Sequence, residues 1–340
     1  MKMKSYHRVT LSRVLGVSAL LFLLLVATSL AALGTGAVQT SFVEILQALR
    51  EFPGGGAENQ ILFSVRLPRI FFAGAVGASL SVAGVVFQAL LRNPLADPYV
   101  LGISGGSALG AIAGIILGAG AFFAGVPFLA FSGAIVTVVL VFVVAGGPCG
   151  VFMDNSLLLA GVVVNSFFSA AILFCLSVVD SMELRSISFW LMGDLSGAAW
   201  PDIGVVFLCL LVAFAVLYSQ ARKLNLLVQG QETASQLGVN IKSAKYIMLT
   251  AASLVTAMAV SLAGIIGFVG MMVPHMMRLM WGSDHRLLLP AAALFGALLL
   301  IAADTLARTI LAPAELPVGV ITALCGAPYF IFLMRRRGGR

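Results

Sequence analysis

Residues 66–90 read RLPRIFFAGAVGASLSVAGVVFQAL, and this stretch sets the class of the whole protein. Beyond Arg69 it carries no charged side chain until Arg92 is reached. A helix needs about 20 predominantly apolar residues to cross the hydrocarbon core of a bilayer. The stretch therefore predicts a transmembrane helix.

Comparable apolar stretches follow one another along the rest of the chain. We expect ten spans, each placed to within a few residues, at 14–33, 66–90, 99–118, 125–145, 157–179, 202–219, 245–264, 267–281, 288–306 and 317–334. The eighth is short and contains Pro274, which membrane helices tolerate where neighbours satisfy the freed carbonyl group. The predicted fold class is an all-α polytopic membrane protein, with residues 1–340 forming a single transmembrane domain.

Composition agrees with this class. Hydrophobic residues make up 61% of the 340 residues and charged residues only 10%, whereas a soluble domain carries about 25% charge. The net charge of +7 comes from Lys and Arg in loops and tails, where they set orientation in the membrane, so nucleic acid is not expected as a partner. Their distribution predicts that both termini are cytoplasmic. The span at 14–33 is longer than the 7–15 apolar residues typical of a signal peptide, so we expect it to be retained.

Enzyme and metal motifs are missing from the sequence. It contains no GxxxxGK[ST] phosphate loop and no HExxH, so the chain is not expected to hydrolyse ATP or to bind a cofactor itself. His275 lies beside several methionines, but a histidine bonded to a carbonyl group near a helix end is commoner than a soft-metal site. The cysteines lack CxxC spacing, and we interpret them as small buried hydrophobic residues: Cys149, Cys175, Cys209 and Cys325.

Glycine recurs at every fourth position of the third span, at Gly102, Gly106, Gly110, Gly114 and Gly118. These positions share one helical stripe, which allows another backbone to approach closely. We expect tight packing within the subunit, and a subunit interface is the alternative.

The segment 222–245 is the longest cytoplasmic loop and the most polar. Within it, 231–237 predicts a short helix, and Gly238 predicts a left-handed cap. The helix is short for a lipid-surface element and lacks basic residues at its centre. We therefore expect it to dock on a partner protein.

Three arginines stand on the outer side, against the usual bias of basic residues towards the cytoplasm. Arg66 and Arg69 flank the start of the second span, and Arg308 lies at the outer end of the ninth. Arginine pairs bidentately with carboxylates. Two interpretations remain open: pairing with Asp304 or Glu315 of the chain itself, or capture of carboxylates on a soluble outer partner.

Five stretches together resemble the permeases of the iron-siderophore, haem and vitamin B12 ATP-binding-cassette (ABC) importers. They are RLPRIFFAGAVGASLSVAGVVFQALLRNPLADPYVLGISGG (66–106), LLLAGV (157–162), GFVGMMVPHMMRL (267–279), DHRLLLPAAALFGALLLIAADTLAR (284–308) and ELPVGVITALCGAP (315–328). The resemblance covers nearly the whole chain from about residue 60, in order and spacing.

The resemblance implies a type II importer permease in a bacterial inner membrane. Its implied partners are a second permease copy, most simply an identical one, two cytoplasmic ATP-binding subunits that use ATP and Mg, and a periplasmic substrate-binding protein. It implies an ATPase-coupling loop that carries ExAxxLG at Glu232, Ala234, Leu237 and Gly238. It also implies that Arg66, Arg69 and Arg308 dock glutamates of the binding protein.

The resemblance further implies a translocation path lined mainly by the fifth and tenth helices. Its gate would lie just before the fifth helix, at Met153, Asp154, Asn155 and Ser156, where the aspartate departs from the small hydroxyl residues usual in the vitamin B12 importer. Asn165 either faces this path or bonds to a neighbouring helix. An ion-coupled secondary transporter, a membrane-embedded enzyme and an importer of an oxyanion such as molybdate remain as alternatives. The first two need membrane-embedded ionisable clusters that the sequence does not show.

Overall fold

The computed structural model describes residues 10–36, 60–119, 125–146 and 154–338. Within these ranges it is almost entirely helical and contains no strand. Its elements are α1 (Leu11–Gly34), the π-helical turn η1 (Leu62–Arg66), α4 (Leu67–Leu90), the 3-10 turn η2 (Pro98–Leu101), α5 (Ile103–Ile116), α6 (Gly125–Gly146), α7 (Asp154–Val178), α8 (Ser181–Met192), α9 (Trp200–Ser219), α10 (Ala221–Gln229), α11 (Gln231–Gln236), α12 (Ile241–Ala263), α13 (Val269–Trp281), α14 (His285–Thr309) and α15 (Val318–Gly338).

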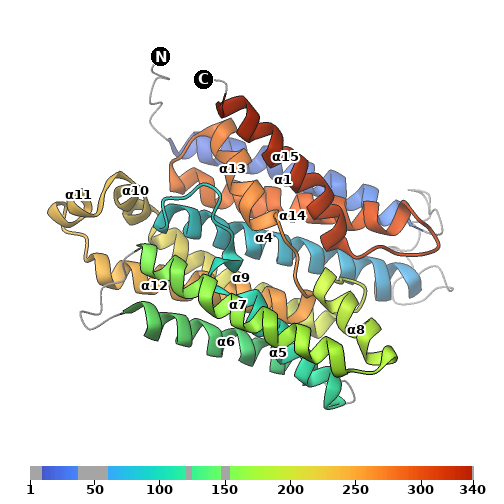
Figure 1. Cartoon of the computed structure of the whole chain (residues 1–340). Helices are drawn as coiled ribbons and strands as arrows, with labels where there is room; N and C mark the ends of the chain where they lie inside the picture. The colour runs from blue at the N-terminus through green and yellow to red at the C-terminus, as the bar shows by residue number, and fades with distance from the viewer. Residues whose placement is uncertain (1–9, 37–59, 120–124, 147–153, 339–340) are drawn as a thin grey trace.

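Each of the ten predicted spans contains one of these helices, which lie roughly side by side in a bundle (Figure 1). Among the described residues, seven helices are long and apolar enough to cross a membrane, and α5 and α15 contain shorter apolar stretches. α13 has 13 residues with Pro274 inside it, as the sequence suggested. The start of α1 and the end of α15 lie towards the end of the bundle that holds α10 and α11 (Figure 1), as an even number of crossings requires.

α4 is the central helix of the bundle. Of its most apolar window 89% is buried inside the chain, against 6% for α1. α14, α12, α13 and α9 pack against it. Two glycines allow this close approach, because a Cβ atom at Gly77 would overlap the carbonyl oxygen of Gly296 on α14, and one at Gly84 would overlap that of Gly270 on α13. The opening stretch of the sequence therefore forms the core around which the other helices assemble.

The prediction of one unbroken helix over 99–118 is wrong. Asp97 caps the short turn η2, and Gly102 then adopts a left-handed conformation with φ of 75°. This conformation suits glycine and interrupts the helix. α5 therefore begins only at Ile103 and is 14 residues long.

The prediction that the cysteines are buried is also wrong in part. Cys175 and Cys209 are only half-buried and Cys325 is exposed within the single chain. All three lie on helices of a membrane protein, where apolar side chains face lipid or another subunit as readily as the core. Cys149 lies outside the described residues.

Candidate functional site

One end of the bundle carries a cluster of charged residues, the arginine cluster, formed by the buried Arg66, Arg69, Asp304 and Arg308 and the more exposed Glu315. Arg69 donates from Nε and Nη2 to the carboxylate of Asp304 over 3.0–3.1 Å. Its Nη1 donates to Oε2 of Glu315 over 2.7 Å. The Nε of Arg308 lies 3.2 Å from Oδ2 of Asp304.

Burial makes this cluster strongly interdependent. The exposed fraction is 5% for Arg69, 2% for Asp304 and 7% for Arg308. A buried charge is tolerated only when it is paired and hydrogen-bonded. Asp304 supplies that pairing to two arginines at once, while the side chain of Glu315 remains 48% exposed.

The cluster also holds the end of α1. Arg66 donates from Nη1 to the carbonyl oxygen of Leu33 over 2.7 Å, and Arg308 donates from Nη2 to that of Ala32 over 3.4 Å. The last carbonyl groups of a helix have no partner within the helix, and cationic side chains satisfy them well. Two of the three predicted docking arginines therefore fasten α1 to the bundle.

The structure thus contains the intramolecular pairing that was one interpretation of these arginines. Arg69 is bound to both Asp304 and Glu315. Docking of a partner on Arg66, Arg69 and Arg308 stays a prediction. Of the carboxylates bound to Arg69, Glu315 is the one that faces outward.

The glycine stripe packs α5 within the subunit. A Cβ atom at Gly106 would overlap Oγ1 of Thr137 on α6, and one at Gly110 would overlap the carbonyl oxygen of Leu129 on the same helix. Gly114 approaches the Cα atom of Val126, which would lie 3.2 Å from an added Cβ. Gly102 and Gly118 serve differently, because they precede and follow α5 with φ of 75° and 67°. Packing of α5 against α6 within one subunit accounts for the three central glycines.

The predicted helix at 231–237 is confirmed as α11, and Gly238 follows it with φ of 83°. The amide groups of Gly238 and Val239 donate back to the carbonyl groups of Ser235 and Ala234, which closes the cap. Ala234 is fully buried, whereas Glu232 and Leu237 point outward, with 62% of Leu237 exposed. The loop therefore offers a leucine and a carboxylate to the outside of the bundle.

The predicted gate falls at the start of α7, whose first turn contains Asp154, Asn155 and Ser156. Met153 lies outside the described residues. A Cβ atom at Gly105 would lie 2.8 Å from Oδ1 of Asn165, so the asparagine side chain packs onto α5. The side chain of Asn165 thus contacts a neighbouring helix, while a hydrogen bond to that helix and a role in the path both stay predictions.

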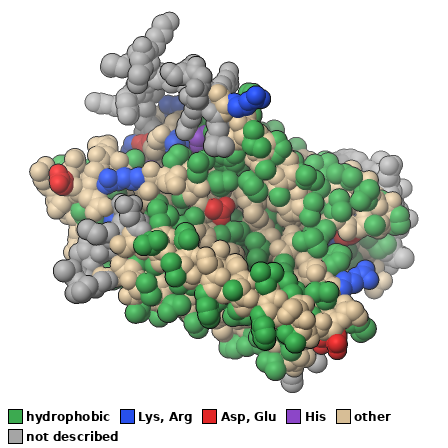
Figure 2. All heavy atoms as spheres, in the orientation of Figure 1, with side chains coloured by type: hydrophobic (Ala, Val, Ile, Leu, Met, Phe, Trp, Pro, Cys, Tyr) green, Lys and Arg blue, Asp and Glu red, His purple; other side chains and the backbone are tan. Residues whose placement is uncertain are grey.

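The visible face of the bundle is dominated by apolar side chains, and charged ones gather mainly towards its ends (Figure 2). α7 and α15 contribute large exposed residues to the surface of the chain: Leu159, Val162, Val163, Phe167, Leu324, Ile331 and Phe332. Exposed apolar surfaces of this kind on a single chain mark contacts with lipid or another subunit.

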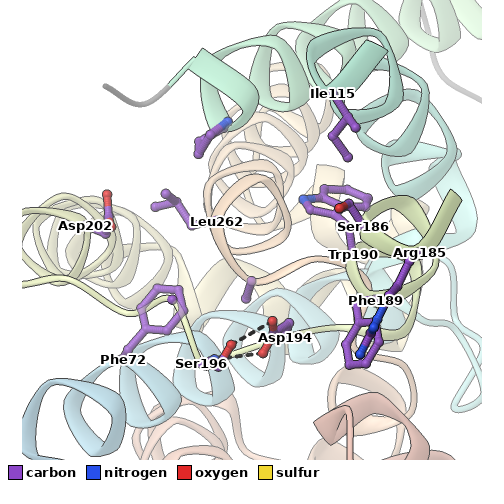
Figure 3. Close-up of a pocket in the computed structure, with 13 residues that line it drawn as sticks. Phe72, Ile115, Arg185, Ser186, Phe189, Trp190, Asp194, Ser196, Asp202 and Leu262 are labelled. Carbon is purple, nitrogen blue, oxygen red and sulfur yellow. Dashed lines mark hydrogen bonds between the residues drawn. The ribbon is translucent and has the colours of Figure 1, made fainter. Parts of the chain in front are cut away.

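An open cavity of about 630 Å³ is lined in part by side chains of α8, among them Arg185 and Trp190 (Figure 3). Its polar lining includes Arg185, Asp194 and Asp202, and its apolar lining includes Phe72 and Trp190. The carboxylate of Asp194 accepts hydrogen bonds from the backbone and the hydroxyl of Ser196, both 2.8 Å long. The lining comes from α4, α5, α6, α8, α9, α12 and the segment after α8, so the cavity is separate from the predicted path on α7 and α15.

Sequence reasoning missed α8 and a junction between α10 and the start of α14. The amide of Asn225 on α10 contacts Asp284 and His285. The sequence assigned no contact to Asp284 and His285, although both begin the stretch DHRLLLP. A helix-capping aspartate before an apolar run was the signal available in the sequence.

Comparison with known proteins identifies the chain. The profile of the FecCD transport family matches residues 23–336. The cobalamin import system permease protein BtuC of Halobacterium salinarum is 46% identical over 277 residues, which cover 82% of this chain and 74% of that protein. The hemin transport system permease protein HmuU of Yersinia pestis is 41% identical, with 93% of this chain and 94% of HmuU covered.

A solved structure agrees with these relatives. A transporter described as a metal-chelate type ABC transporter, in an inward-facing conformation, superimposes with a TM-score of 0.83 and 33% identity. The match covers 94% of this chain and 99% of that one. It confirms the predicted permease fold, and the chain belongs to the FecCD transport family.

Proposed function

We propose that the chain is the permease subunit of an ATP-driven importer that moves a metal chelate across the inner membrane by alternating access. The observation that carries the proposal is the agreement of three features on one chain: a permease fold, a family match over residues 23–336, and a capped helix that presents Leu237 outward. The relatives named for cobalamin and hemin support a large metal-containing cargo.

The partners follow from the same architecture. α11 would dock on a cytoplasmic ATP-binding subunit, through Leu237 and Glu232. Two such subunits would use ATP and Mg, and the permease would contribute no catalytic group. A second permease copy would cover the apolar faces of α7 and α15, and the path would run between the two copies. The gate at residues 153–156 would open and close this path.

Arg66, Arg69 and Arg308 would dock glutamates of a periplasmic binding protein. In the single chain Arg69 already binds two carboxylates, so a docking glutamate would replace the exposed Glu315 as its partner. The ion-coupled alternative loses its nearest candidate, since Asp304 is held by two arginines and is therefore poorly suited to carry protons.

The test is recovery of partners from native membranes. A tagged chain should bring with it an ATP-binding subunit in equal amount, identified by mass spectrometry. Leu237→Asp should abolish that recovery, because it places a charge in the docking contact. Leu117→Asp is the matched control: this leucine is 75% exposed and follows α5, away from α10 and α11.

The outcomes separate the parts of the proposal. Absence of an ATP-binding subunit with the unaltered chain would overturn the importer. Its equal recovery with both variants would overturn the role of α11. Cyanocobalamin, haemin and a ferric hydroxamate, each tested for ATP-dependent uptake into proteoliposomes with the recovered partners, would identify the cargo.

A further inference from the structure

Asn225 of α10 uses every polar group of its side chain on the start of α14. Its Nδ2 donates to Oδ1 of Asp284 over 2.9 Å. Its Oδ1 accepts from the backbone amide of His285 over 2.9 Å and lies 2.7 Å from Nδ1 of the same histidine. Since the acceptor is an amide oxygen, Nδ1 of His285 carries the proton in this contact.

The α14 side of this contact is itself held firmly. Asp284 caps α14 by accepting from the backbone amide of Arg286 over 3.0 Å, and its carboxylate also binds the Arg286 side chain over 2.6 Å. Burial opposes ionisation of Asp284, but the hydrogen bonds from Arg286 and Asn225 outweigh it and lower the pKa of the carboxyl to about 2. His285 is 2% exposed. Asn225 therefore meets an ordered and charged acceptor.

α10 is tied to a second element and continues into α11. Arg92, in the segment after α4, donates from Nη2 to the carbonyl oxygen of Leu227 over 3.2 Å. Leu224 and Leu227 are buried against the bundle. Gly230 then joins α10 to α11, and the two short helices pack on each other. A force applied at α11 thus reaches Asn225 through a short, packed segment.

α14 is placed to carry such a force across the bundle. It packs along α4, α1, α13 and α15. At its far end it bears Asp304 and Arg308, which belong to the arginine cluster. Interactions at its two ends therefore connect α10 with α1 and with the segment that leads into α15.

We propose that Asn225 is a positioning residue that fastens the coupling loop to α14, so that α10, α11 and α14 move as one body when the ATP-binding subunit closes. The inference rests on the proposed function, because it needs a partner that moves α11. It adds the element that receives the motion and the side chain that transmits it.

The experiment measures one distance in the assembled complex. Nitroxide labels are placed at Val228 of α10 and Leu306 of α14, both exposed, in a chain whose native cysteines are replaced by alanine. The second permease copy of the complex carries no label, so that only the distance within one copy is recorded. The distance between the labels is recorded by electron paramagnetic resonance in the complex with the recovered ATP-binding subunits, with and without ATP and vanadate. The unaltered anchor should give one narrow distance that nucleotide does not change.

Four variants test the anchor. Asn225→Asp should broaden the distribution and make it respond to nucleotide, because its carboxylate faces that of Asp284. Asp284→Asn alone should keep the narrow distance, since its amide oxygen still accepts from Asn225. The double variant should restore the distance, because the new amide donates to the new carboxylate. Asn240→Asp is the control, since Asn240 caps α12 and aspartate caps a helix equally well.

The outcomes for the anchor and for the proposed function are distinct. Loss of the ATP-binding subunit from the chain with native Asn225 and Asp284 would overturn the proposed function. Recovery of that subunit with every variant, together with an unchanged distance in Asn225→Asp, would overturn the anchor. A double variant no better than Asn225→Asp would show that the side-chain contact is not what transmits the motion.

Discussion

Each end of α14 has an aspartate that holds basic or polar side chains, and the two aspartates differ in burial. At one end Asp304 holds two arginines in a place where all three side chains are at most 7% exposed. At the other end Asp284 holds Arg286 and Asn225, and its side chain is 22% exposed. Both aspartates fasten α14 to a neighbouring segment of the chain.

Burial determines how much stability is lost when a carboxylate is removed, because it decides whether water can replace that carboxylate. Water can replace Asp284 as the partner of Arg286, whose side chain is 40% exposed. Water cannot easily reach Arg69 or Arg308, so the loss of Asp304 would leave Arg308 without a carboxylate and Arg69 with only the half-exposed Glu315. We therefore expect equal chemical changes at the two ends to have unequal effects.

The largest expected effect follows from Asp304→Ala. Breaking a buried ion pair by removing one partner costs about 3–5 kcal/mol. Asp284→Ala, the matched change at the other end, should cost about 1 kcal/mol, as for loss of a helix N-cap. Thermal unfolding of the purified chains in one detergent should rank the midpoints as unaltered, Asp284→Ala and Asp304→Ala. Equal midpoints for the two variants would contradict the comparison.

A smaller effect should follow from Gly110→Ala, at the contact between α5 and α6. The added methyl group meets the carbonyl oxygen of Leu129, which is backbone and moves only with its helix. Overpacking of this kind costs about 1–3 kcal/mol. Gly16→Ala on α1 is the control, because its Cβ would have no neighbour within 4 Å. The same unfolding measurement applies, and a midpoint for Gly110→Ala at or above that of Gly16→Ala would show that the helices are not in tight contact.

Glu315→Gln should change stability by about 1 kcal/mol or less, as for exposed ion pairs. Its partner Arg69 keeps both oxygens of Asp304 after the change. The unfolding midpoint should stay close to that of the unaltered chain and far above that of Asp304→Ala. A drop as large as that of Asp304→Ala would mean that Glu315 compensates the buried charge as much as Asp304 does.

The smallest expected effect concerns pH at the Asn225 end. The lowered pKa of Asp284, about 2 in the folded chain, means that its carboxylate adds stability above the ordinary pKa near 4 and loses it only as the pH falls through 2. The difference in unfolding midpoint between the unaltered chain and Asp284→Asn should therefore be the same at pH 8 and pH 5.5. A difference that disappears at pH 5.5 would show that the carboxylate is not held as described.

The sequence was sufficient for the spans and for part of the site. Apolar length placed a helix in each of the ten predicted spans, and within the part of the chain that the structure describes seven of these helices are long and apolar enough to cross a membrane. Gly238 placed the cap of α11, and both signals are local. The break at Gly102 was missed, since a glycine at regular spacing in an apolar stretch looks like a packing position until its φ angle is known. The double role of Asp304 and the contact from Asn225 to Asp284 join residues far apart in sequence, and only the fold brings them together.

The grip on α1 has a consequence for how the protein is made. α1 is translated before every other helix that the structure describes, and Arg66, which binds the Leu33 carbonyl, follows 33 residues later. Arg308, which binds Ala32, follows 276 residues after its acceptor. At a synthesis rate of about 5–20 residues per second, that interval lasts roughly 14 to 55 s. Arg66 can therefore bind α1 early, whereas Arg308 can bind it only after most of the bundle has been translated. The attachment of α1 is thus completed late in biogenesis.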